Sequence, residues 1–213
     1  MNNSILFAMP TLFNRPSVIR TVVASLEKQM GPYDKLVIIA NEESAEFMNW
    51  DTPHTKLVSG ERYNIGKALN LALDLMDHDY FCFIHDDIII RDDEWINKYI
   101  YTYNTHNVGQ IGIIEHRTGV QKAFGECLWA DGVFFVARDR IMKVGRFDEE
   151  YHGDCETADF AHRLIEAGWK NYVLMVDGHH RNQNFKDKQD GDLAFRDLVN
   201  ASRKRYIDKW VKK

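Results

Sequence analysis

Short, unbroken apolar runs alternate along the chain with longer stretches in which apolar residues recur every three or four positions. Runs of the first kind are typical of strands that are buried on both faces of a sheet, and stretches of the second kind are typical of helices with one buried side. The apolar runs predict strands at residues 4–9, 35–40, 55–59, 80–85, 110–115, 132–137 and 170–175. The periodic stretches predict helices at residues 16–30, 44–50, 68–76, 95–105, 139–144, 158–167 and 193–213.

Strands and helices alternate strictly through the first part of the chain. This rhythm is typical of βαβ units, which form parallel sheets with right-handed crossovers. We therefore expect an α/β fold with a mostly parallel central sheet flanked by helices, in one domain over residues 1–213. Polar, acidic or glycine-bearing segments predict loops at residues 116–126, 145–156 and 182–192.

Composition narrows the class of protein. The net charge of −5 argues against a nucleic-acid-binding surface, which is usually basic. The three cysteines are widely spaced and do not suggest a disulfide framework. The first residues lack a basic leader region, so we expect no signal peptide, and no apolar run approaches the roughly 20 residues of a transmembrane helix.

The strand predicted at residues 80–85 ends in two adjacent acids, Asp86 and Asp87. Ligands of open α/β sheets bind at the carboxyl ends of the strands, so both acids are expected where a ligand would lie. Neighbouring carboxylates repel each other, and a divalent cation relieves that repulsion because hard cations prefer carboxylate oxygen. The alternative is that both acids are simply solvated.

Other polar groups follow other strands of the predicted sheet. Residues 11–15, residues 41–43 and the pair His179-His180 each come after a strand, so we expect them near Asp86. The glycine-bearing turn at residues 62–67 has cations and backbone donors suited to phosphate, although it is neither a GxGxxG motif nor a P-loop. Solvated cations in the turn and structural histidines are the alternatives.

The segment from Asp148 to Asp159 is dense in acids. An acid buried beside an acceptor hydroxyl has a raised pKa and can take its proton. Before it, Trp129 and Asp131 combine an aromatic face with a carboxylate, an arrangement common in sugar binding, although a core tryptophan is an equal alternative.

Taken in order, several short motifs resemble those of the inverting family 2 glycosyltransferases, which have the GT-A fold. The resemblance covers nearly the whole chain, and its specificity lies in the order and spacing of the motifs. The matching segments are Pro10-Thr11 with Asn14-Arg15, Asn64 and Gly66 with Ala68 and Asn70, His85-Asp86-Asp87, residues 145–149, Glu156 to Asp159, and Arg163-Leu164.

The resemblance implies a metal-dependent enzyme that moves a hexose from a UDP-sugar, such as UDP-glucose, to a hydroxyl acceptor on a glycan, with inversion. It implies a nucleotide-binding half over about residues 1–90 and an acceptor half over about residues 91–213. The implied cofactor is Mn²⁺ or Mg²⁺, with Asp87, Asp86 and His180 (or His179) as ligands. The implied donor contacts are Pro10, Thr11, Asn14, Arg15, Asn41, Arg62, Asn64, Gly66, Lys67 and Asp86, and the acceptor contacts are Trp129, Asp131 and Asp159.

One departure from the family pattern concerns the catalytic base. Thr157 stands where many members have the catalytic aspartate, so we expect the base to be Glu156 or Asp154. A catalytically inactive module that binds nucleotide sugars or glycans is the main alternative. A sugar-phosphate nucleotidyltransferase is less favoured because residues 11–15 contain no glycine. We expect a cytoplasmic enzyme of bacterial or viral origin, which can also be one domain of a longer protein.

Overall fold

The structure is a computed structural model, and it describes residues 3–12, 15–41, 52, 54–61, 63–114, 124–130, 132–180 and 193–212. At residues 41, 114, 179, 180, 193 and 194 it describes the backbone alone. The helix predicted at residues 44–50, the polar segment at 182–192 and most of the loop predicted at 116–126 therefore lie outside the described residues.

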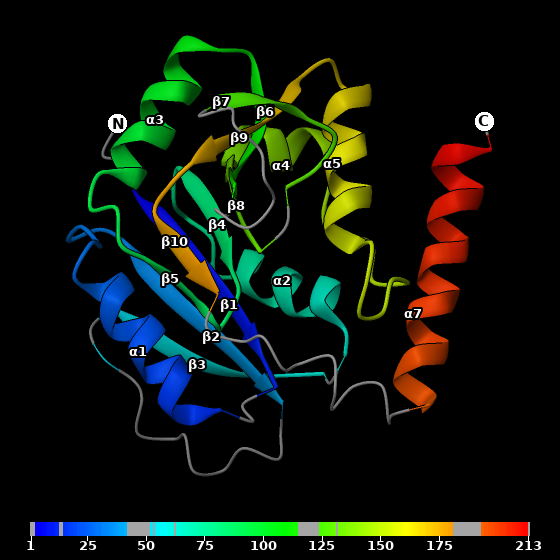
Figure 1. Cartoon of the computed structure of the whole chain (residues 1–213), viewed down its shortest axis with the longest axis horizontal. Coiled ribbons are helices and arrows are strands. Elements are labelled where there is room, and N and C mark those ends of the chain that lie inside the picture. Colours follow the sequence, from blue (N-terminus) through cyan, green and yellow to red (C-terminus); the bar gives the residue numbers. More distant parts are fainter. Residues whose placement is uncertain are drawn as a thin grey trace.

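One eight-stranded sheet runs through the molecule in the order β3-β2-β1-β4-β8-β6-β9-β7 (Figure 1). Strands β1 to β4 pair in parallel, as do β6 and β9, whereas β8 is antiparallel to both its neighbours and β7 is antiparallel to β9. The mostly parallel sheet is thus confirmed. The strands are β1 (Ile5–Thr11), β2 (Lys35–Asn41), β3 (Thr55–Gly60), β4 (Tyr80–Ile84), β6 (Val108–Ile114), β7 (Phe124–Cys127), β8 (Val133–Ala137) and β9 (Lys170–Met175).

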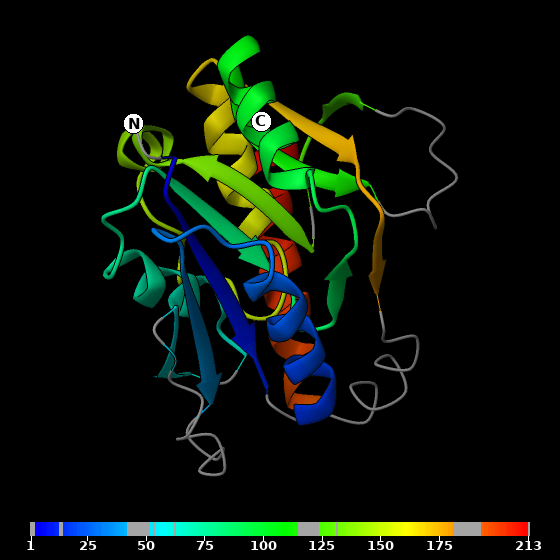
Figure 2. The same cartoon turned by 90° about the vertical axis from the view of Figure 1, so that its left-hand side faces the viewer.

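Helices cover both faces of this sheet, which explains the unbroken apolar runs. In Figure 2 the blue helix α1 and the teal helix α2 lie on opposite sides of strands β1 and β2. Alternate residues of β1 point into two separate cores: Phe7 packs with residues of α1 and α3, and Leu6 packs with residues of α2 and α5. The helices are α1 (Pro16–Glu27), α2 (Ile65–Leu73), α3 (Trp95–Thr105), α4 (Arg138–Val144) and α5 (Glu156–Glu166).

A second, two-stranded sheet forms beside the end of β4. Here β5 (Ile88–Ile90) pairs antiparallel with β10 (Gly178–His180). This pairing brings two segments that are distant in sequence to the same edge of the main sheet.

The loop prediction at residues 116–126 is wrong where the structure describes it, because residues 124–127 form strand β7. Among the described strands it lies at the edge of the sheet and has β9 as its single neighbour. Its residues alternate between exposed and half-buried, so they carry no continuous apolar signal.

The helix predicted at residues 193–213 divides into the α-helix α7 (Leu193–Tyr206) and the π-helical turn η3 (Ile207–Val211). In this wider turn the consecutive residues Lys209 and Trp210 both reach the carboxylate of Asp159 on α5. The C-terminal helix accordingly lies beside α5 (Figure 1). Within the described part of the chain, no helix is both long and apolar enough to cross a bilayer.

Candidate active site

The acids Asp86 and Asp87 occupy a turn that is fixed on both sides by buried apolar strands. The strand before them, β4, is buried from Phe81 onward, and the strand after them, β5, is buried throughout. The amide of His85 donates to the carbonyl of Gly132 at 2.8 Å, which ties the start of the turn to the β8 side of the sheet. The two carboxylate side chains keep only 17% and 13% of their surface exposed.

Parallel pairing of β1 with β4 brings the end of β1 to this turn. The Thr11 hydroxyl donates a hydrogen bond to Asp86, and one Arg15 nitrogen lies 3.8 Å from Asp86 Oδ1 and 3.7 Å from Asp87 Oδ2. Burial raises the pKa of Asp86, and the Thr11 hydrogen bond opposes that shift. The structure therefore brings Thr11, Arg15, Asp86 and Asp87 together, at the place where the sequence predicts a site.

Other predicted donor contacts lie at the same edge of the sheet. Pro10 precedes Thr11 at the end of β1, and Asn41 ends the neighbouring strand β2. Only the backbone of Asn41 is described, and Asn14 lies outside the described residues. The role of each in donor binding stays a prediction.

The predicted third metal ligand is placed by the small sheet. His180 pairs through its backbone with Ile88, the residue that follows Asp87, and His179 pairs with Ile89. The side chains of both histidines lie outside what the structure describes. The pairing shows that residue 180 reaches the aspartate turn, and it leaves the choice between the two histidines open.

The carboxylate oxygens of the aspartate turn suit a hard divalent cation. Two adjacent carboxylates, one with its pKa raised by burial, favour a cation that offsets their charge. Mg²⁺ is commonly bound through one or two carboxylates, with water and substrate phosphates completing the shell. Among the described residues there is no cluster of three or more His, Cys, Asp or Glu side chains with metal-binding geometry. A metal bound here would thus be coordinated by Asp86, Asp87 and groups other than the described side chains.

Asn64 and Gly66, at the start of α2, have a structural role that their local sequence does not indicate. Asn64 is 4% exposed; its side-chain oxygen accepts from the Lys67 amide at 2.8 Å, and its side-chain nitrogen donates to the Glu149 carbonyl at 3.1 Å. A Cβ on Gly66 would lie 3.0 Å from the Asp148 carbonyl oxygen. Both residues therefore hold the acidic segment against α2.

Of the two cations predicted to bind phosphate in this turn, the structure describes only Lys67. The Lys67 ammonium pairs with Glu61 at 2.6 Å on the surface. Arg62 lies outside the described residues. Phosphate binding by either residue stays a prediction.

The acids of the candidate catalytic segment have distinct environments. Glu156 is the first residue of α5 and is 4% exposed. Asp154 pairs with Arg203 of α7 at 2.5 Å. Glu156 is thus the more enclosed of the two candidate bases, and Asp154 is engaged with the C-terminal helix.

Asp159, which the sequence predicts as an acceptor contact, is shielded from solvent in this structure, and acceptor binding by this residue stays a prediction. Its side chain is fully buried, and its carboxylate accepts from Lys209 at 2.7 Å, Trp210 at 2.9 Å and Arg163 at 3.0 Å. The physical reason is that α5 and the C-terminal turn enclose it. Asp159 therefore anchors the two elements to each other.

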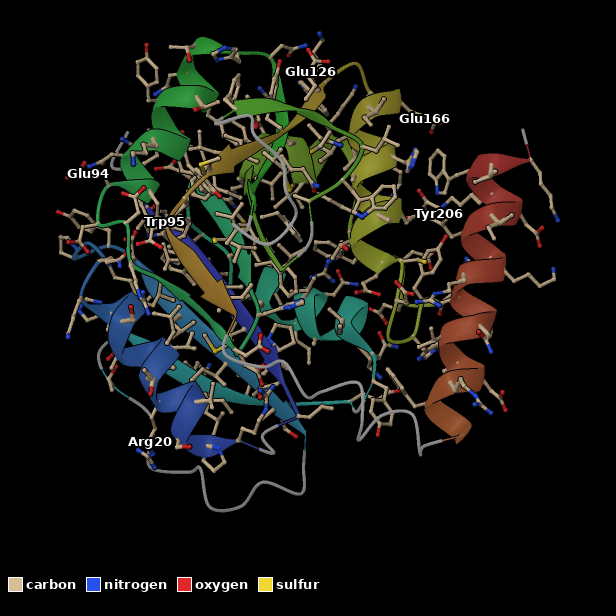
Figure 3. All side chains as sticks on the ribbon, viewed as in Figure 1. Arg20, Glu94, Trp95, Glu126, Glu166 and Tyr206 are labelled. Carbon is tan, nitrogen blue, oxygen red and sulfur yellow. The ribbon has the colours of Figure 1, made fainter. Side chains whose placement is uncertain are left out.

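Trp129, another predicted acceptor contact, lies beside the C-terminal helix. Trp129 keeps 43% of its surface exposed, and its ring and the Tyr206 ring form a T-shaped pair at a centroid distance of 6.4 Å. Figure 3 labels Tyr206 on α7, on the side that faces α5. Asp131 lies outside the described residues, so the predicted pair of aromatic ring and carboxylate stays a prediction.

Comparisons with known proteins agree with this architecture. The family described as Glycosyl transferase family 2 matches residues 8–154, a range that includes the aspartate turn and most of the acidic segment. No curated protein matches the chain at a significant level.

Solved structures with the same fold are similar to the chain over almost its full length. A mannosyltransferase, PcManGT from Pyrobaculum calidifontis in complex with GDP-Man and Mn²⁺, is similar with a TM-score of 0.68 and 12% identity, over 99% of this chain and 76% of that one. TarS from S. aureus, residues 1–349, is similar with a TM-score of 0.63 and 14% identity, over 99% of this chain and 73% of that one. At these identities the likeness shows the fold alone.

Proposed function

Since the chain belongs to glycosyl transferase family 2, we propose that it transfers a hexose from a nucleotide-diphosphate sugar to a hydroxyl acceptor, with inversion and with the help of a divalent cation. The observation that carries the proposal is the meeting of Thr11, Arg15, Asp86 and Asp87 at the carboxyl ends of β1 and β4. This is the edge of an α/β sheet at which nucleotide ligands bind.

The donor is expected to be a UDP-sugar, in which the nucleoside sits near the ends of β1 and β2. Pro10, Thr11 and Asn41 lie there. The PcManGT structure contains GDP-Man, so a guanine nucleotide is the natural comparison in any donor screen.

Asp86 and Asp87 would hold Mn²⁺ or Mg²⁺, with His180 as the further protein ligand. When bound, such a cation neutralises the charge that develops on the leaving diphosphate. Arg15 is the described cation nearest to this position, and its charge would add to that effect.

The base that takes the proton of the acceptor hydroxyl is proposed to be Glu156. Its position at the first turn of α5 and its burial are suited to a carboxylate that meets a hydroxyl in an enclosed site. Asp154 is the second candidate, and it would first have to leave Arg203.

A donor screen tests this proposal directly. The purified chain is incubated with UDP- and GDP-hexoses and Mn²⁺, with and without glycan acceptors, and released nucleoside diphosphate is measured. We expect release with at least one donor, its loss in Asp87→Ala, and full activity in the control Asp93→Ala, which alters an exposed acid six positions along the chain. Glu156→Gln should keep the affinity for the donor and lose transfer.

Two results would contradict the proposal. Full activity in Asp87→Ala would remove the aspartate turn from the mechanism. A wild-type chain that binds UDP or GDP with Mn²⁺ in calorimetry but releases no nucleoside diphosphate would be a binding module.

A further inference from the structure

Arg15 is held firmly by its backbone, at the start of α1. It is the residue that caps this helix, and its carbonyl oxygen accepts from the amides of Val18 at 3.1 Å and Ile19 at 3.2 Å. Pro16 follows as the first helical residue, which fixes the entry of the chain into the helix. The base of the Arg15 side chain therefore has a set position beside the aspartate turn.

The guanidinium group of Arg15 reaches both carboxylates of that turn. The same nitrogen lies 3.8 Å from Asp86 Oδ1 and 3.7 Å from Asp87 Oδ2. These separations are longer than the 2.7–2.9 Å of charge-assisted hydrogen bonds, so the contacts are electrostatic and not a bidentate fork. The Arg15 side chain is also 26% exposed, so solvent is open to it if it moves.

A single positive charge thus lies where a cation bridging the two carboxylates would lie. The two adjacent carboxylates are largely buried and repel each other, and a positive charge close to both offsets that repulsion. Arg15 supplies one positive charge against two negative ones. A divalent cation supplies two positive charges and is coordinated directly by carboxylate oxygens, so it can replace Arg15 at Asp86 and Asp87.

We propose that Arg15 is a tethered counter-ion that competes with the metal for Asp86 and Asp87, and that turns to the donor diphosphate once the metal has displaced it. The inference rests on the proposed function, because it takes the aspartate turn as the metal site. Its consequence is an order of binding: the metal alone binds weakly, and the metal together with a nucleoside diphosphate binds well, because only then does the displaced guanidinium gain a new anion.

The test is a pair of affinity measurements with Arg15→Gln, which removes the charge and keeps a polar side chain. Mn²⁺ alone is titrated and followed by electron paramagnetic resonance, and UDP is titrated by calorimetry at saturating Mn²⁺, with GDP as a parallel arm. We expect Mn²⁺ alone to bind about 5- to 30-fold more tightly to the variant, since the repulsion from one unit charge a few ångströms away, partly screened by solvent, is worth on the order of tenfold in affinity. We expect the nucleotide to bind several-fold more weakly.

Two variants serve as controls. Arg20→Gln removes a cation from the same helix at a position that Figure 3 shows on the outer side of α1, away from the sheet, and should change neither affinity. Arg15→Lys keeps the charge and should stay close to wild type in both measurements. Circular dichroism and thermal unfolding confirm that each variant is folded.

Affinity changes of opposite sign support the inference, and they do so even if no donor is turned over, in which case the proposed transfer activity alone fails. If Arg15→Gln binds Mn²⁺ alone no more tightly than wild type does, Arg15 does not compete for the carboxylates and the inference is wrong. If Mn²⁺ binds more tightly but the nucleotide affinity is unchanged, the transfer of Arg15 to the diphosphate is wrong.

Discussion

Replacing Asp159 by alanine tests how strongly the C-terminal turn is fixed to α5. The Asp159 side chain is fully buried and accepts from Lys209, Trp210 and Arg163. Alanine would leave two cations and an indole N–H without their acceptor inside a packed interface. Removing one partner of a buried ion pair costs about 3–5 kcal/mol, and the lower end applies here because the Lys209 side chain is 35% exposed and can partly rehydrate.

The assay is urea unfolding of Asp159→Ala followed by circular dichroism, together with thermal unfolding. A loss of about 3 kcal/mol corresponds to a fall in Tm of roughly 6–12 °C, because a chain of this size loses about 2–4 °C per kcal/mol. If the variant fails to fold, Lys209→Met removes one donor and leaves Arg163 on the carboxylate, which should give a smaller loss in the same direction.

Asp208→Ala is the matched control. Asp208 lies in the same π-helical turn and pairs with Lys204 and Lys212, each at 2.6 Å, but it is exposed. Exposed ion pairs contribute little because water and salt screen them. We expect its unfolding curve to match that of wild type. The reasoning is refuted if Asp159→Ala is no less stable than Asp208→Ala.

Three further changes test other parts of the structure. Gly112→Ala would place a Cβ 2.0 Å from the Cβ of Ala130, so thermal unfolding should show a loss of about 1–3 kcal/mol or more. An unchanged Tm would contradict this close approach of Ala130 to Gly112 on β6. Asn64→Ala removes the cap on the Lys67 amide at the start of α2 and should cost about 1–2 kcal/mol in urea unfolding, whereas a neutral result would show that the cap is dispensable. Burial lowers the pKa of His162, so as the pH drops the unfolded chain protonates this histidine before the folded chain does. The free energy of unfolding should therefore fall as the pH drops below about 6.5. The fall should be shallower in His162→Gln, and equal slopes would show that this histidine is not responsible.

The parts of the fold that the sequence predicts are those with a local signal. The apolar runs of β1 and β4 report burial on both faces, and the polar residues after them report the sheet edge where Thr11 and Asp86 meet. The edge strand β7 was missed because its exposed face breaks the apolar pattern. Local patterns thus identify central strands well and edge strands poorly.

Side-chain pairing between distant segments is harder to predict from one sequence. Asp154 and Asp159 are both acids of one segment, yet one pairs with Arg203 on the surface and the other is enclosed by Lys209 and Trp210, about fifty residues away in the chain. Nothing in the local sequence separates these environments. The same holds for Arg15, whose contact with Asp86 joins residues from different strand–helix units.

The most direct test of the account is the position of the metal in a crystal grown with Mn²⁺ and either UDP or GDP. Anomalous scattering from manganese locates the ion independently of any assumption about its ligands. We expect a single strong peak bound by Asp87, beside Asp86, that also contacts the diphosphate. A peak elsewhere, or aspartate side chains turned away from the nucleotide, would contradict it.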